Sequence, residues 1–217
     1  VVDIKGKERV EGITLAEVDS KGKPIPGTEE EYTCDTLLLS CGLIPENEIS
    51  RGMGVDMNPV TSGPKVNESL ETNIEGVFAC GNVLHVHDLV DFVSQEATMA
   101  GNCAAAYVKT GRTEETEEIP VKCGSGVRYT VPAKIRPAYM EEKLPVRFRV
   151  GQVYQKASIT VRSGDTVLLR KKRPIMAPGE METVYIKKDS LSPDNIGNDI
   201  TTVSYTHLRA HETAANL

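Results

Sequence analysis

The chain has 217 residues, of which 39% are hydrophobic and 26% charged, and its formal net charge is −6. These are ordinary values for a globular protein in water. No apolar run approaches the ~20 residues of a membrane-spanning helix, and no signal peptide opens the chain, so the sequence favours the cytoplasm. Five cysteines without a Cys-x-x-Cys pair argue against a disulfide scaffold and against a zinc site.

Two patterns organise the first 45 residues. Ser20–Pro24 contains the glycine and proline typical of a hairpin turn. Cys34–Cys41 is an apolar run that ends at Gly42 and Pro45. A continuous apolar run between such breakers predicts a strand buried in a parallel sheet.

The most informative segment follows. Val77–Cys80 predicts a short buried strand that stops at Gly81 and Asn82, and Ser94–Tyr107 predicts a helix. Open α/β sheets hold cofactors with a polar group at the carboxyl end of a strand, before a helix. Gly81 allows close approach of a ligand, and the Asn82 amide both donates and accepts hydrogen bonds, as sugar-alcohol hydroxyls require.

This segment resembles the second FAD fingerprint of the two-dinucleotide-binding-domain flavoproteins, the family of thioredoxin reductases and related NAD(P)H oxidoreductases. The matching residues are Thr72, Gly76, Val77, Phe78, Ala79 and Gly81. Asn82 stands where the family usually has Asp, which binds the ribityl chain of FAD. The resemblance implies FAD and NAD(P) as cofactors, with Gly81, Asn82, Gln95 and Glu96 as the cofactor-binding residues. In the family, the start of the following helix faces the flavin pyrimidine, where its positive dipole stabilises the reduced anion.

The resemblance also covers the upstream residues. Val1–Val18 resembles the closing strands of the NAD(P) domain, and Gly42 to Pro45 resembles the turn back to the FAD domain. Within the family, the segment resembles in particular the FAD/NAD(P)-binding subunits found with anaerobic glycerol-3-phosphate, sarcosine and opine dehydrogenases. The Gly-x-Gly-x-x-Gly loops of the family do not occur here, so we expect a fragment that binds FAD weakly or not at all.

Two histidines, His85 and His87, lie between the predicted strand and the helix, close to the expected flavin. A histidine there is a candidate catalytic residue that moves a proton when hydride reaches the flavin, with Asp88 or Asp91 orienting it. The alternative is a loop histidine bonded to a backbone carbonyl. A metal site would need more ligands than this loop shows, so no metal ligand is predicted.

The second half of the chain predicts a different class of structure. An acidic linker, 111–122, precedes runs rich in Val, Ile, Thr and Tyr, which predict an antiparallel β-sandwich or small barrel over 123–192. The expected strands are Val127–Val131, Pro145–Val150, Ala157–Val161, Thr166–Lys171 and Glu182–Lys187. The Arg170–Arg173 run fits a charged edge strand better than a binding site.

Charge divides the chain in the same way. Residues 1–120 hold 9 basic and 22 acidic residues, whereas 121–192 hold 15 basic and 6 acidic residues. A basic module of this kind docks on the acidic part or on an acidic partner subunit. No nucleic-acid-binding motif is present.

The fold class is therefore α/β, as a partial two-dinucleotide-binding-domain flavoprotein, followed by a small all-β antiparallel domain. The expected parts are 1–45 (end of the NAD(P) domain), 46–110 (end of the FAD domain), the linker, the β domain and a tail over 193–217. Val203–Thr213 resembles a translated sequencing adapter, so this tail is expected to be disordered.

Three functions remain open at this point. The first is an FAD-dependent NAD(P)H oxidoreductase that passes hydride to a small-molecule substrate or a partner dehydrogenase subunit. The others are a disulfide reductase of the thioredoxin-reductase type and a non-catalytic β-rich interaction module on a degenerate flavoprotein.

Overall fold

The structure, a computed structural model, describes residues 1–40, 42–111, 116–191 and 199–206. The chain divides into two compact units, Val1–Gly42 and Leu43–Leu217. None of the described helices is both long and apolar enough to cross a membrane.

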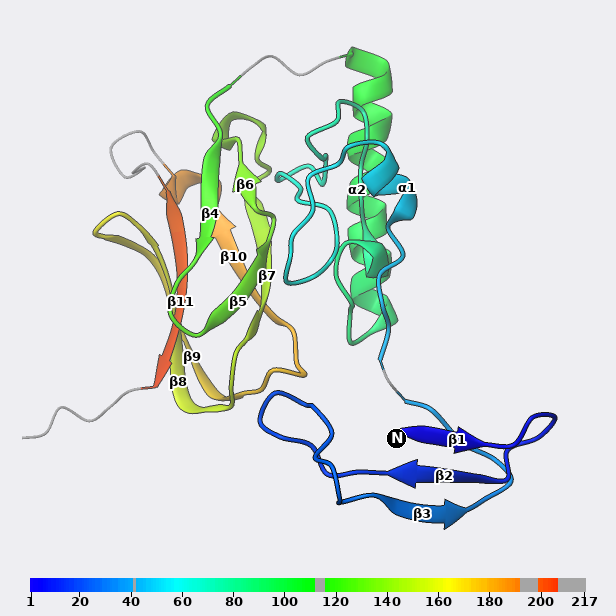
Figure 1. The fold of residues 1–217 in the computed structure, drawn as a ribbon. Coiled ribbons are helices and arrows are strands. Elements are labelled where there is room, and N and C mark those ends of the chain that lie inside the picture. The colour runs from blue at the N-terminus through cyan, green and yellow to red at the C-terminus, as the bar shows by residue number, and fades with distance from the viewer. Residues whose placement is uncertain (41, 112–115, 192–198, 207–217) are drawn as a thin grey trace, which may run out of the picture. The chain divides into compact units, whose positions relative to one another are not determined.

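The first unit is a three-stranded antiparallel sheet in the order β1-β2-β3 (Figure 1). Its strands are β1 (Asp3–Lys5), β2 (Gly12–Leu15) and β3 (Glu30–Thr33). Between β2 and β3, Val18 bridges Pro24, and the Asp19 N–H donates to the Lys23 carbonyl over 2.9 Å. The hairpin turn predicted for Ser20–Pro24 is therefore confirmed.

The buried parallel strand predicted for Cys34–Cys41 is wrong for the described residues 34–40, which form no strand. Leu38 is 90% exposed and Leu39 is 67% exposed. Such a strand is stable only between neighbours and under covering layers, whereas the sheet of this unit ends at β3 and all its pairs are antiparallel. The α/β character of the predicted fold class is correspondingly weak, with mixed sheets and few helices among the described residues.

The helices of the second unit are α1 (Glu48–Gly52), the single turn η1 (Gly81–Val83) and α2 (Val90–Thr110). The helix predicted for Ser94–Tyr107 is confirmed, and it begins earlier, at Val90. The strand predicted for Val77–Cys80 is reduced to one bridge between Phe78 and Glu71. The reason is local: residues 67–79 fold back on themselves, and the Ala79 N–H bonds to the Leu70 carbonyl rather than to a neighbouring strand.

The rest of the second unit consists of two sheets, ordered β10-β7-β5 and β6-β4-β11-β8-β9. The strands are β4 (Ile119–Cys123), β5 (Val127–Val131), β6 (Lys134–Ile135), β7 (Lys143–Val150), β8 (Tyr154–Ser163), β9 (Thr166–Met176), β10 (Glu182–Lys187) and β11 (Ile200–Thr206), with single turns η2 (Pro137–Tyr139) and η3 (Lys188–Ser190). Every strand predicted in this region is present.

Two strands lie outside the expected β domain. β4 falls in the expected linker. This segment forms a strand because Ile119 and Val121, which alternate with exposed residues, are buried. β11 falls in the expected tail, where it pairs antiparallel with β8 and parallel with β4, so the domain is not purely antiparallel. Residues 193–198 and 207–217 of the expected tail lie outside the described residues.

Two buried clusters hold the second unit together. The larger cluster fills the β domain, with Phe148, Ile159, Met176 and Ile200 fully buried; each such side chain stabilises the fold by roughly 1.5–3 kcal/mol. The smaller cluster joins the loops and α2 to β5, through Val66, Leu70, Ala79, Leu84, Ala100, Tyr129 and Val131. In Figure 1 these loops lie between α2 and the strands β5 and β7. The expected parts 46–110 and 123–192 thus form a single unit.

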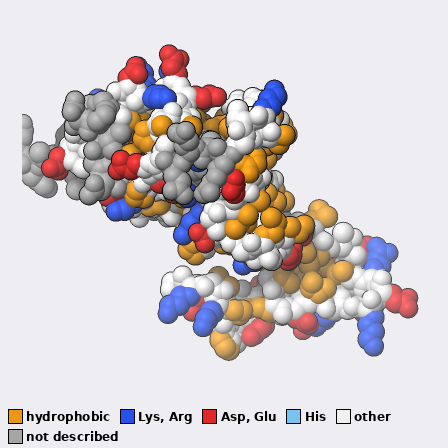
Figure 2. Space-filling model, turned by 90° about the horizontal axis from the view of Figure 1, so that it is seen from above, with side chains coloured by type: hydrophobic (Ala, Val, Ile, Leu, Met, Phe, Trp, Pro, Cys, Tyr) orange, Lys and Arg blue, Asp and Glu red, His pale blue; other side chains and the backbone are white. Residues whose placement is uncertain are grey.

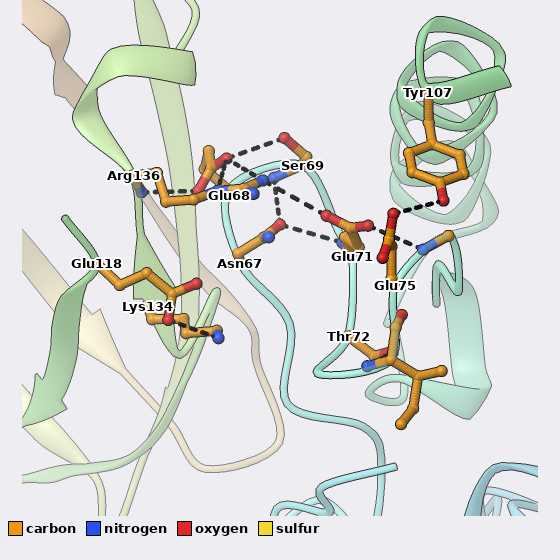
Figure 3. Close-up of polar contacts among 12 residues, drawn as sticks. Asn67, Glu68, Ser69, Glu71, Thr72, Glu75, Tyr107, Glu118, Lys134 and Arg136 are labelled. Carbon is orange, nitrogen blue, oxygen red and sulfur yellow. Dashed lines mark hydrogen bonds and ion pairs between the residues drawn. The ribbon is translucent and has the colours of Figure 1, made fainter. Parts of the chain in front are cut away.

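A buried ion pair reinforces this junction (Figure 3). The Arg136 side chain donates to Glu68 Oε1 from Nε and Nη2, over 3.0 and 2.8 Å, and its backbone N–H donates to Glu68 Oε2 over 2.8 Å. Glu71 Oε2 lies 3.6 Å from the same guanidinium. The docking of the basic module on the acidic part, expected from the charges, is present in the structure. On the face drawn in Figure 2, apolar side chains are exposed between charged ones.

Candidate functional site

The candidate site is built around the carboxylate of Glu96, on the second turn of α2. Glu96 is fully buried, and so is His85, whose Nε2 lies 2.9 Å from Glu96 Oε2. His87 Nε2 lies 3.0 Å from Glu96 Oε1. The Gly81 N–H donates to Oε1 over 2.7 Å, and Arg147 Nη1, from β7, donates to Oε2 over 3.2 Å. One carboxylate therefore joins the end of the FAD-like fingerprint, both histidines and the β domain.

The charges of this histidine cluster (His85, His87, Glu96 and Arg147) follow from its contacts. Burial alone would raise the pKa of the Glu96 carboxyl, but the hydrogen bonds from His85 and His87 outweigh burial and lower the pKa from 4.5 to about 2. Burial lowers the pKa of His85, an effect only partly opposed by the hydrogen bond to Glu96. At neutral pH Glu96 is ionised and His85 is neutral, so His85 Nε2 is the donor of their hydrogen bond.

The structure brings the two predicted catalytic histidines together but orients them differently from the expectation. Their rings lie edge to face with centroids 4.4 Å apart, and Glu96, not Asp88 or Asp91, accepts their hydrogen bonds. The Nδ1 atoms of both histidines are buried without a hydrogen-bond partner among the described residues. A catalytic role for either histidine stays a prediction.

The predicted cofactor-binding residues divide into two groups. Gly81 and Glu96 are buried and bonded to each other, whereas Asn82 and Gln95 are exposed. Asn82 Oδ1 accepts the His87 N–H over 3.1 Å, and its NH₂ group makes no hydrogen bond with the described residues. Because α2 begins at Val90, Gln95 lies beyond the four free N–H groups of the helix start, and only its side chain is available to a ligand.

Gly81 is the position where backbone freedom is required. Its φ is +71°, a conformation that other residues adopt only with strain. This conformation turns the chain from residues 77–80 into η1 and presents the Gly81 N–H to Glu96. Gly81 thus sets the direction of the loop that contains His85 and His87 (the histidine loop).

Sequence reasoning missed the contribution of the β domain. Arg149, on β7, donates from Nη2 to the Val86 carbonyl over 3.0 Å and pairs with Asp88. The other oxygen of Asp88 accepts the Met181 N–H over 2.6 Å. Arg147 and Arg149 alternate with apolar residues along one strand, and no local pattern indicates which acidic groups such arginines will meet.

The histidine cluster also meets the geometric requirement for metal binding. His85, His87 and Glu96 offer three ligand atoms within 4.8 Å of one another, a donor set used by zinc and non-haem iron. However, the carboxylate already accepts four hydrogen bonds, one from the Arg147 guanidinium. A divalent ion would displace them and add charge beside a buried cation, which is costly. The arrangement favours a hydrogen-bonded cluster, and the absence of a metal stays a prediction.

The cysteines of the described residues are all free thiols: Cys34, Cys80, Cys103 and Cys123. Burial raises the pKa of the Cys80, Cys103 and Cys123 thiols. These three side chains are therefore thiols rather than reactive thiolates at neutral pH.

Comparison with known proteins identifies the class to which the first half of the chain is similar. Residues 2–106 match the model of the pyridine nucleotide-disulphide oxidoreductase family. This segment is therefore similar to that family, and the prediction that the family's cofactors are FAD and NAD(P) is confirmed.

Two curated relatives agree with this family. The chain is 31% identical over 90 residues to an NAD(P)H sulfur oxidoreductase (CoA-dependent) of Pyrococcus abyssi, covering 42% of this chain and 17% of the relative. It is 31% identical over 135 residues to a dihydrolipoyl dehydrogenase of Trypanosoma brucei brucei, covering 58% of this chain and 26% of the relative. The chain thus spans about a quarter or less of these relatives. No solved structure matches.

Proposed function

We propose that this chain belongs to an FAD-dependent NAD(P)H oxidoreductase and supplies the part that holds the ribityl arm of the flavin. The observation that carries the proposal is the turn at Gly81 and Asn82, inside the segment that matches the family. It places an exposed side-chain amide beside a glycine with positive φ. The NH₂ group of that amide makes no hydrogen bond with the described residues.

The donor set of this turn fits a polyol. Asn82 is held by one hydrogen bond, from the His87 N–H to its Oδ1, so the direction of its NH₂ group is set before a ligand arrives. The Gln95 side chain, also exposed, offers a second amide from α2. Neutral amides donate to and accept from hydroxyl groups equally well, which suits the ribityl chain better than it suits a phosphate.

The remaining residues of the site position the turn. A bound flavin would supply the hydride chemistry, and Asn82 and Gln95 would hold its ribityl arm. Glu96 fixes Gly81 through the backbone N–H, and it keeps the loop of His85 and His87 folded over α2. Neutral His85, with Nε2–H bonded to Glu96, keeps Nδ1 as a hydrogen-bond acceptor.

The substrate or electron acceptor is part of the same proposal. The resemblance to FAD/NAD(P)-binding subunits of glycerol-3-phosphate, sarcosine and opine dehydrogenases favours a small organic substrate or a partner dehydrogenase subunit. The proposed location of the protein is the cytoplasm. We expect the 217-residue chain by itself to bind FAD weakly or not at all, because it contains no Gly-x-Gly-x-x-Gly loop for the pyrophosphate.

The test uses the protein translated from the complete gene that contains this sequence. That protein should purify with FAD, and Asn82→Leu should weaken FAD binding about tenfold by removing hydrogen bonds worth ~1 kcal/mol each. Asn82→Asp should keep the flavin. Asn102→Leu is the matched control, because Asn102 is exposed on α2 and makes no hydrogen bond with the described residues. A colourless complete protein, or full flavin affinity in Asn82→Leu, would refute the proposal.

A further inference from the structure

A pocket of about 320 Å³ opens beside the histidine loop, in the second unit. Its walls come from three parts of the chain: residues 43–45, residues 60–62 with His85 and Val86, and the strands β5 and β7 of the β domain. The volume lies at the lower end of the range of ligand sites. At ~30 Å³ per water-sized group, it accommodates a molecule of roughly ten non-hydrogen atoms.

The β-domain wall of this pocket is cationic. Arg128 from β5 and Arg149 from β7 line it, and no carboxylate does. Arg149 is held by the Val86 carbonyl and by Asp88. Arg128 is exposed and makes neither a hydrogen bond nor an ion pair with the described residues. The pocket therefore contains one guanidinium whose charge is not neutralised.

Tyr129, from β5, also lines the pocket and carries a phenol hydroxyl. Tyr129 is 6% exposed, and its ring packs edge to face on His85 with centroids 6.0 Å apart. Burial raises the pKa of the Tyr129 hydroxyl, against the opposing effect of Arg149 and Arg128. At neutral pH the hydroxyl is protonated and is a hydrogen-bond donor.

Another part of the lining is apolar. Ile44 is 84% exposed and Val60 is 46% exposed, so the pocket leaves apolar side chains uncovered beside its cationic wall. A ligand that satisfies both walls carries an oxyanion at one end and a hydrocarbon body at the other. Inorganic phosphate satisfies only the first requirement.

The wall formed by residues 60–62 is held in place by Asn47. The buried amide of Asn47 donates to the Ser62 carbonyl over 3.0 Å and to the Val83 carbonyl over 2.7 Å. This ties the two loops of the pocket to each other and to the start of α1. A pocket held in this way loses little entropy when a ligand binds.

We propose that this pocket binds a small organic acid, with Arg128 as the principal partner of its carboxylate and Arg149 and the Tyr129 hydroxyl as further donors. Guanidinium and carboxylate form paired, charge-assisted hydrogen bonds, and Ile44 and Val60 cover the hydrocarbon body. That the acid is the substrate of the flavin rests on the proposed function. Its binding to the pocket does not.

The experiment is a calorimetric titration of the 217-residue chain at low salt with benzoate and with benzamide, which have the same size and differ in charge. Benzoate should bind at least about tenfold more tightly than benzamide, because only benzoate forms the charge-assisted pair. Arg128→Gln should weaken benzoate binding at least about tenfold, and Arg128→Lys should weaken it less. Arg162→Gln, which removes an exposed arginine of β8, should leave binding within twofold.

Three results would overturn the inference: equal binding of benzoate and benzamide, unchanged benzoate binding in Arg128→Gln, or displacement of benzoate by equimolar inorganic phosphate. Displacement of benzoate by FAD would also overturn it, since the pocket would then belong to the flavin. The Asn82 experiment measures FAD binding separately. Benzoate binding to the pocket in a protein that refuses flavin would therefore refute the proposed function and leave the anion site standing.

Discussion

Replacing Glu96 with glutamine tests the hydrogen-bonded centre of the structure. The change keeps the size of the side chain but removes a charge that receives four hydrogen bonds. It also leaves Arg147, 5% exposed, without its anionic partner. Breaking a buried ion pair on one side costs about 3–5 kcal/mol. The pKa of Glu96 gives a similar figure, because a shift from 4.5 to about 2 corresponds to roughly 3 kcal/mol at 1.36 kcal/mol per unit.

A loss of this size is a large part of the 5–15 kcal/mol that stabilises a typical domain. Urea denaturation at pH 7, followed by circular dichroism, measures it for Glu96→Gln, and Glu180→Gln is the control because Glu180 is exposed. We expect a loss of about 3–5 kcal/mol for Glu96→Gln and less than ~0.5 kcal/mol for the control. If Glu96→Gln loses less than ~1 kcal/mol, the reasoning about the carboxylate is refuted.

Three further predictions follow from buried contacts. The stability that Glu96 gives is present above its unfolded pKa of 4.5 and is lost as the pH falls toward about 2, so acid denaturation curves should lose roughly 3 kcal/mol over that window in the unchanged protein and much less in Glu96→Gln. Arg136→Leu should cost about 3–5 kcal/mol in urea. The double variant with Glu68→Leu should cost less than the sum of the single changes, because the Glu68 carboxylate is then not left buried without its cation; additive costs would contradict the pair. Gly63→Ala should lower the free energy of unfolding by more than ~1 kcal/mol, because the new Cβ would lie 1.9 Å from the Leu84 carbonyl oxygen. Gly101→Ala on α2, with open space around it, should raise the free energy of unfolding by about 0.5–1 kcal/mol. Thermal melts that rank the two variants the other way would show that the loops are packed differently.

The parts of the fold that depend on neighbouring residues in the sequence were predictable. The hairpin turn at Ser20–Pro24, the helix over Ser94–Tyr107 and the five strands of the β domain all follow from local periodicity and turn residues. β4 was not predicted, because Ile119 and Val121 follow an acidic run whose composition is typical of a linker.

The elements that failed depend on distant partners. The apolar residues of 34–40 have the composition of a buried strand, yet burial of a parallel strand requires neighbours that no local pattern supplies. The same limit applies to the site. His85 and His87 were found from the loop in which they lie, but Glu96 as their common acceptor requires the histidine loop to fold over the second turn of α2. Arg147 requires the docking of a strand 51 residues further along the chain.

The β domain is a part of the candidate site rather than an appendage. Arg147 completes the hydrogen bonds of Glu96, and Arg149 fixes the carbonyl of Val86 and the carboxylate of Asp88. Both arginines lie on β7, whose apolar residues belong to the core of the β domain. A shift of β7 would therefore disturb the contact with Glu96 on α2 and the contacts with Val86 and Asp88 at the same time. The β domain therefore supplies the arginine that holds the loop at Val86 and Asp88, and it also supplies the cationic wall of the pocket.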